Sequence, residues 1–121
     1  ELINKSYQLL TQYGYNVDKN IFHIDFHTYN LLNNKYKNAF AWHQDDYGAI
    51  NEKVNTIIYY LRKDEGIKSG NLLYKDKNNK KIEVVIKSNM ILMLDGRIKH
   101  KPDNLEGYGL RNSIVVQFKR I

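Results

Sequence analysis

The residues of this chain that could carry chemistry are few, and most of them are histidines and carboxylates. The 121 residues include four histidines, thirteen Asp and Glu together, and no cysteine. Without cysteine the chain can form no disulfide, no zinc–thiolate site and no cysteine nucleophile. A metal ion held by this chain would therefore need imidazole and carboxylate ligands.

The pattern His-x-Asp occurs twice, as His23-Ile24-Asp25 and as His43-Gln44-Asp45. On an extended backbone, residues i and i+2 point to the same side, so either pair could face one cation. His100 follows a strongly apolar segment, residues 90–94, and its turn, and could supply a third ligand. Two histidines and one carboxylate form the facial arrangement of non-haem Fe(II) oxygenases, which leaves coordination positions open for reactants.

The segments around these residues predict one short helix followed by strands. The apolar stripe from Leu2 to Tyr13 has helical spacing, and Gly14 ends it. We expect a turn at Asn33-Asn34. Strands are expected at residues 21–29, 39–42, 54–61, 71–74, 82–86, 90–94 and 113–118, with a polar loop over 63–70. Because no helices separate the strands, the pattern favours a β-sandwich or jelly roll over a parallel α/β fold.

A further motif gives these ligands a context. Arg111-Asn112-Ser113 follows His100 after residues 101–110. With this spacing the chain resembles the 2-oxoglutarate/Fe(II) oxygenase superfamily, whose signature is His-x-Asp, a later His, and then Arg-x-Ser. Two more blocks resemble its prolyl-hydroxylase-like members, residues 56–61 and the Ser-Gly-Asn-Leu-Leu-Tyr block at 69–74. The resemblance covers Phe22 to Arg120.

The resemblance implies a fold, a site and a reaction. The fold would be a double-stranded β-helix (jelly roll, cupin-like), mostly β, with a short N-terminal helix. Fe(II) would be held by His43, Asp45 and His100, and the cosubstrate 2-oxoglutarate by Arg111 with help from Ser113. Ascorbate is expected as a possible accessory reductant. The reaction would convert 2-oxoglutarate to succinate and CO2 while a substrate C–H bond is hydroxylated. Because Asp45 is present, the halogenase variant of this chemistry is disfavoured.

Several residues keep two interpretations. Tyr29 and Tyr60 would line the cosubstrate pocket, or pack in the core as ordinary aromatics. His23, Asp25 and His27 form a rival ligand set on one strand face. No Arg-x-Ser element follows that set at a suitable distance, so they are expected to be polar wall residues or to touch substrate. The remaining alternatives are an ordinary surface ion pair for His43 and Asp45, a solvated basic loop around His100, a structural salt bridge from Arg111 to Asp103 or Glu106, and either a supporting or an exposed position for Asp46.

Size and charge limit the class of protein. Residues 1–121 are expected to form a single oxygenase catalytic domain, and since the chain does not begin with Met it could be a fragment of a longer one. No apolar run is long enough for a membrane span, and no secretory signal is recognisable, so a cytoplasmic location is favoured. The net charge of +6 would suit a polyanionic partner, although the lysines around residues 75–81 are typical of a solvated loop.

The function predicted first is hydroxylation of a protein or peptide side chain, by analogy with prolyl-hydroxylase-like members. Oxidative demethylation of nucleic acid is a second enzymatic reading, which the positive charge would suit. A catalytically inert β-barrel that binds nucleic acid or protein is the third, and the complete ligand set argues against it. The sequence leaves the oligomeric state open.

Overall fold

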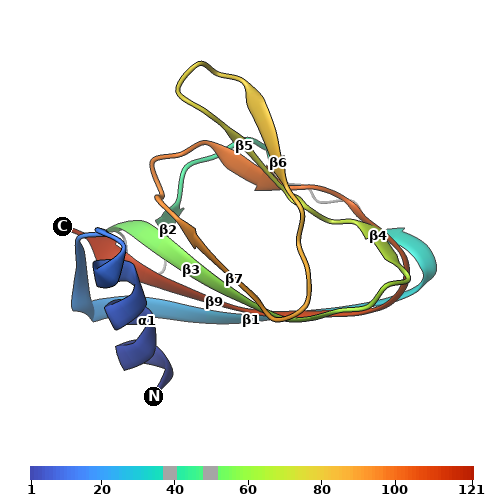
Figure 1. Cartoon of the computed structure of the whole chain (residues 1–121), viewed down its shortest axis with the longest axis horizontal. Coiled ribbons are helices and arrows are strands. Elements are labelled where there is room, and N and C mark those ends of the chain that lie inside the picture. The colour runs from blue at the N-terminus through green and yellow to red at the C-terminus, as the bar shows by residue number, and fades with distance from the viewer. Residues whose placement is uncertain (37–40, 48–51) are drawn as a thin grey trace.

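One helix and two antiparallel sheets make up the computed structural model, which describes residues 1–36, 41–47 and 52–121 (Figure 1). The fold is mostly β, as the sequence predicts. The elements in chain order are α1 (Leu2–Gln12), β1 (Val17–Tyr36), β2 (Asp46–Tyr47), β3 (Glu52–Lys63), β4 (Ile67–Ser69), β5 (Leu72–Lys75), β6 (Lys81–Val84), β7 (Met90–Leu94), β8 (His100–Pro102) and β9 (Leu105–Arg120).

The larger sheet is built on three long strands in the order β1-β9-β3, with β2 beyond β3. β7 also pairs with β3, and β4 pairs with β9. The β1–β9 ladder runs from Val17 opposite Arg120 to Tyr36 opposite Leu105, almost the whole length of both strands. The smaller sheet has the order β6-β5-β8, and in Figure 1 it lies above the long strands.

Alternation along the long strands separates two environments. On β3, Ile57 belongs to the core under the helix, whereas its neighbours Thr56 and Ile58 line a cavity. On β9, Val116 and Phe118 belong to that core, and the residues between and before them line the cavity. The larger sheet therefore has one face for α1 and one face for the site.

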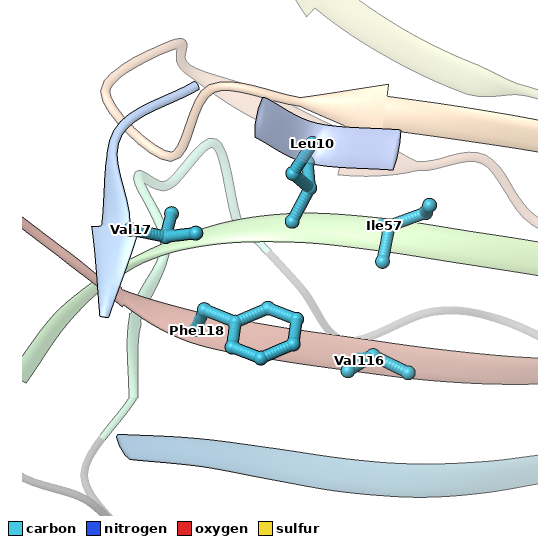
Figure 2. Packing of buried hydrophobic residues seen from close by; sticks show 5 residues of the cluster. All are labelled: Leu10, Val17, Ile57, Val116 and Phe118. Atoms are coloured by element: carbon cyan, nitrogen blue, oxygen red, sulfur yellow. The ribbon is translucent and has the colours of Figure 1, made fainter. Parts of the chain in front are cut away.

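The helix closes the outer face of the larger sheet. The side chain of Glu1 caps its start by accepting a hydrogen bond from the backbone N–H of Asn4 (2.8 Å), and Gly14 follows its end with φ +88°. Figure 2 shows Leu10 of α1 above the strands, in a core cluster of Leu10, Val17, Ile57, Val116 and Phe118. The hydroxyl groups of Ser6 and Tyr59 lie 2.6 Å apart and add a polar contact between helix and sheet.

Four local expectations need correction. The turn expected at Asn33-Asn34 is wrong, because Asn33 takes a positive φ of 59° and forms an irregularity inside β1, which continues to Tyr36. Of the strand expected at 39–42, residues 39–40 lie outside the described residues, while 41 and 42 belong to no strand. The loop expected over 63–70 contains β4, and β9 begins earlier than predicted, so Arg111 lies within it.

Within residues 1–36, 41–47 and 52–121, no helix has the length and apolarity that a bilayer crossing requires.

The core cluster predicts a large effect for Phe118→Ala. The Phe118 ring is fully buried, with the rings of Tyr7 and Phe22 at 6.2 and 6.1 Å between centroids. Removing the ring leaves a cavity, so the free energy of unfolding should fall by about 3–5 kcal/mol in urea titrations. Phe26, 73% exposed on β1, is the matched control, and Phe26→Ala should change stability by less than about 0.5 kcal/mol. Equal losses in the two variants would contradict this position of the core.

Candidate metal centre

His43 and His100 are brought together by the backbone. The N–H of His43 donates to the carbonyl of His100 (3.1 Å), and the N–H of His100 donates to the carbonyl of His43 (2.9 Å). Residues paired in this way in an antiparallel ladder carry their side chains on the same face. The two imidazoles accordingly lie side by side, with ring centroids 4.5 Å apart.

Asp45 is held by contacts on both sides of its peptide. Its N–H donates to the carbonyl of Gly96 (2.8 Å), and its own carbonyl accepts from the N–H of Val54 (3.3 Å). Gly96 is required where its turn meets Asp45 and Val54, because a Cβ there would lie 1.9 Å from the carbonyl oxygen of Val54. The turn after β7 and the start of β3 together fix the position of this carboxylate.

The three side chains converge on one point. Their ligand atoms all lie within 4.8 Å of one another, and no other group of three His or acidic residues in the described part of the chain does so. Asp45 Oδ1 is 3.0 Å from His100 Nε2 and 3.7 Å from His43 Nε2. His43 is the accessible member, with 37% of its side chain exposed against 7% for His100. The structure thus assembles the set predicted from the sequence.

The imidazole hydrogen bonds leave the correct nitrogens for a metal. Nδ1 of His43 lies 2.9 Å from the carbonyl of Ala41, and Nδ1 of His100 lies 2.8 Å from the carbonyl of Ile98. A carbonyl can only accept, so each Nδ1 carries the hydrogen, and each neutral ring then has its lone pair on Nε2. A backbone carbonyl on the distal nitrogen is the usual support for a metal-bound histidine. The donor set therefore fits a divalent cation such as Fe(II).

Two polar side chains that were not predicted as site residues, Thr56 and Gln117, hold the Asp45 carboxylate in position. The Thr56 hydroxyl donates to Asp45 Oδ2 (2.7 Å), and Gln117 Nε2 lies 3.4 Å from that hydroxyl oxygen and donates to it. Thr56 and Gln117 are 2% and 8% exposed. Because Oδ2 is occupied, Oδ1 is the oxygen turned to the histidines. The sequence carried a signal, because Asn55 and Thr56 are polar residues at the start of the otherwise apolar and aromatic run 54–61.

The protonation of this cluster follows from its burial and its contacts. Burial disfavours the charged Asp45 carboxylate, but the hydrogen bond and charge of His100, together with the hydrogen bond from Thr56, hold its pKa below the usual value. Burial likewise opposes a charged His100, but its contacts with Asp45 raise its pKa overall. Both shifts favour a protonated His100 paired with an ionised Asp45, so a cation at Nε2 would have to displace a proton.

All seven residues that the sequence assigned to metal or cosubstrate line one cavity of about 500 Å³: Tyr29, His43, Asp45, Tyr60, His100, Arg111 and Ser113. Arg111 is 7% exposed, and one of its Nη atoms donates to the carbonyl of Gly70 (2.9 Å). Its Nε is buried without a hydrogen-bond partner among the described residues. The guanidinium carbon lies 5.3 Å from the centre of the Tyr60 ring.

The contacts of Arg111, Tyr29 and Tyr60 bear on the alternative interpretations of these residues. Arg111 forms no ion pair with Asp103, Glu106 or any other carboxylate among the described residues. A buried guanidinium without a carboxylate is costly, so this cavity is suited to an anionic ligand. Tyr60 and Tyr29 line the cavity and also pack against apolar clusters. Their contact with a cosubstrate stays a prediction.

The rival ligand set is not brought together. His23 Nε2 lies 3.1 Å from Asp25 Oδ2, but the described residues supply no third ligand to this pair. Asp25 and His27 instead line the cavity from β1, as polar wall residues. Asp46 lies in β2, and its side chain is outside the described residues.

Removing the Thr56 hydroxyl should weaken metal binding. In Thr56→Val the Asp45 carboxylate loses the hydrogen bond that orients it, and we expect Co(II) or Mn(II) affinity to fall about 10–100-fold. Thr56→Ser keeps the hydroxyl and should retain most of the affinity. Thr28→Val, the same change at an exposed position of β1, is the control, and an equal loss of affinity there would rule out this role for Thr56.

Metal affinity should also depend on pH. The pKa of His100 is raised, so its Nε2 keeps the proton to higher pH than a free imidazole does. Apparent affinity for Co(II) should therefore fall as pH drops below that pKa and level off above it, because binding must release the proton. Titrations at pH values on both sides of neutrality measure this, and an affinity constant across that range would contradict the assignment of His100.

Solved structures resemble this fold, although no protein-family model and no curated protein sequence matches the chain. A prolyl-4-hydroxylase from Pseudomonas putida aligns over 96% of this chain and 61% of its own, with a TM-score of 0.58 and 15% identity. A prolyl 4-hydroxylase from Phytophthora capsici aligns over 94% of this chain and 39% of its own, with a TM-score of 0.66 and 16% identity.

A bsmA homologue from Methylobium petroleophilum PM1 has a TM-score of 0.57 at 12% identity, over 82% of this chain and 42% of its own. The chain thus spans between 39% and 61% of the length of these three proteins. At such low identities the likeness bears on architecture alone. This chain has the double-stranded β-helix fold of the prolyl-4-hydroxylase structures.

Proposed function

We propose that this chain is an Fe(II)- and 2-oxoglutarate-dependent oxygenase that hydroxylates a C–H bond. One observation carries the proposal: a single cavity contains both a convergent His43–Asp45–His100 cluster and a buried arginine, Arg111, that has no carboxylate partner among the described residues. A metal-binding barrel needs only the first of these features. An oxygenase that uses a dicarboxylate cosubstrate needs both in the same space.

Two nitrogens and one oxygen of the cluster would hold the iron. His43 and His100 offer Nε2, because their Nδ1 hydrogens are committed to backbone carbonyls, and Asp45 offers Oδ1, because Thr56 occupies Oδ2. With 2-oxoglutarate bound, iron supplies the oxidative chemistry: one atom of O2 enters the substrate C–H bond and the other enters succinate, with release of CO2.

Arg111 would hold the distal carboxylate of 2-oxoglutarate. Its planar guanidinium can donate two parallel hydrogen bonds to a carboxylate, and its burial makes that pairing stronger than it would be in water. Ser113, two residues further along β9, lines the same cavity and can donate one more hydrogen bond. A Cβ at Gly70 would lie 2.9 Å from an Arg111 Nη atom, so glycine there leaves the guanidinium its room.

The rest of the wall would keep water from the reacting atoms. Ile58, Leu72, Leu94 and Val115 line the cavity with apolar surface. Such a lining strengthens the contacts of the bound carboxylate and limits unproductive side reactions. The accessible side of His43 marks where a substrate could approach the cluster.

For the substrate we propose a protein or peptide side chain, as predicted from the sequence. The support is the fold shared with two prolyl 4-hydroxylase structures. Because fold alone does not fix a substrate, this step rests on analogy.

The test is the formation of succinate from 2-oxoglutarate by the purified chain with Fe(II) and ascorbate. Enzymes of this chemistry turn over slowly without their substrate, so an iron-dependent signal is expected. His43→Ala/Asp45→Ala should abolish it, because two of three ligands are lost. His23→Ala removes the histidine of the other His-x-Asp copy and should leave succinate formation unchanged. Circular dichroism establishes that both variants remain folded.

Two outcomes would overturn the proposal. The first is no succinate together with no binding of 2-oxoglutarate in the presence of Mn(II), which would favour an inert binding barrel. The second is loss of succinate formation in His23→Ala but not in His43→Ala/Asp45→Ala. This result would assign iron binding to the rival ligand set of His23, Asp25 and His27.

A further inference from the structure

We propose that the outer side of the smaller sheet binds single-stranded nucleic acid through a surface made of Trp42, Lys75, Lys81, Lys99 and Lys101, here called the lysine–tryptophan surface. This inference goes beyond the proposed function and does not depend on it. It begins at the backbone pair of the candidate metal centre. Since His43 and His100 face the cavity, their neighbours Trp42 and Lys101 are turned to the opposite side.

Side-chain contacts agree with this alternation. Lys101 Nζ lies 5.1 Å from the centre of the Trp42 ring, and Lys75 Nζ lies 4.7 Å from it. The ring is half-buried, so part of it remains accessible beside two ammonium groups. Lys75 belongs to β5 and Lys101 to β8, so three segments distant in sequence contribute to one small area.

Two more lysines extend the positive charge across the strands. Lys81 of β6 lies directly opposite Lys75 in the ladder, and the N–H of Lys75 donates to the carbonyl of Lys99 (2.9 Å). Lys81 and Lys99 are both exposed. Like charges opposite one another on neighbouring strands are destabilising.

This repulsion is not relieved inside the chain. Among residues 1–36, 41–47 and 52–121, none of the four lysines forms an ion pair with a carboxylate. Of the nearby acids, Glu83 accepts a hydrogen bond from the Asn71 side chain, and Asp76 accepts from backbone N–H groups of its own turn. An external polyanion would offset the charge, and the net +6 of the chain would assist its approach.

Trp42 distinguishes between the polyanions that could bind this surface. Single-stranded nucleic acid is bound by combining a basic track for the phosphates with an aromatic side chain on which a base stacks. Trp42, with Lys75 and Lys101 beside it, offers both elements in one place. An acidic peptide would contact the lysines alone, whereas a base can also stack on the accessible part of the Trp42 ring. The sequence has no aromatic–basic stripe, because these residues meet only after folding.

The chain offers its own reporter, since Trp42 is its one tryptophan. We would titrate the full chain with oligo(dT) in EDTA, without iron or 2-oxoglutarate, and follow tryptophan fluorescence beside the anisotropy of labelled oligonucleotide. Binding should quench Trp42 and weaken steeply with salt. Because no metal is needed, failure here and failure of the oxygenase proposal are distinguishable.

Matched variants distinguish binding at the lysine–tryptophan surface from a general effect of net charge. Lys75→Gln/Lys101→Gln should weaken binding at low salt by about tenfold or more and lower the salt slope by about 1.4, as expected for two lost phosphate contacts on a single strand. Lys5→Gln/Lys87→Gln removes the same charge at exposed positions elsewhere and should have little effect. Trp42→Leu, read by anisotropy, should lose about 5-fold or more through the lost stacking.

Three outcomes would overturn the proposal. They are no quenching by oligo(dT) at low salt, equal losses in the two double-lysine variants, and binding of poly-glutamate as tightly as oligo(dT) with Trp42→Leu unaffected. The last outcome would assign the surface to acidic peptides instead.

Discussion

The backbone pair between His43 and His100 is the constraint on which the rest of this molecule depends. Two hydrogen bonds, 3.1 and 2.9 Å long, tie the segment leading to Asp45 against β8. They place two imidazoles on one face at the spacing that a shared cation needs, with no contribution from a hydrophobic core. Asp45 is then positioned by the separate crossing at Gly96, where a side chain would collide with the carbonyl of Val54. The convergence of the three candidate ligands is a consequence of main-chain geometry.

The same pair divides the smaller sheet into two chemical faces. Toward the cavity it presents imidazoles beside a carboxylate whose second oxygen is bound by Thr56. On the other side it presents an aromatic ring with two lysine ammonium groups over it. Because strand side chains alternate, a site for a cation and a surface for an anion can lie back to back within one thin sheet. The metal-ligand cluster and the lysines then lie on opposite sides of the sheet and do not pack against each other.

Arg111 is a further charged residue that lines the same cavity. A buried guanidinium is tolerated here because Gly70 accepts one of its hydrogens and the Tyr60 ring lies beside it. Its remaining donors have no carboxylate in the described structure, which leaves the cavity prepared for an anionic ligand. Arg111 lies in β9, whose other face carries part of the core beneath α1.

The sequence by itself determined residue types, spacing and alternation, which were enough for a mostly β fold and for β7 at residues 90–94. The resemblance of its motifs added the seven predicted site residues, all of which line the cavity. Tertiary structure decided whatever depends on distant partners. It extended β1 past Asn33, because pairing with β9 outweighs a local turn preference. It also chose between the two His-x-Asp copies by supplying His100 to one of them, brought Thr56 to Asp45 and Gln117 to Thr56, and placed Lys75 and Lys101 over the Trp42 ring. These contacts join residues far apart in the chain, and no local pattern records them.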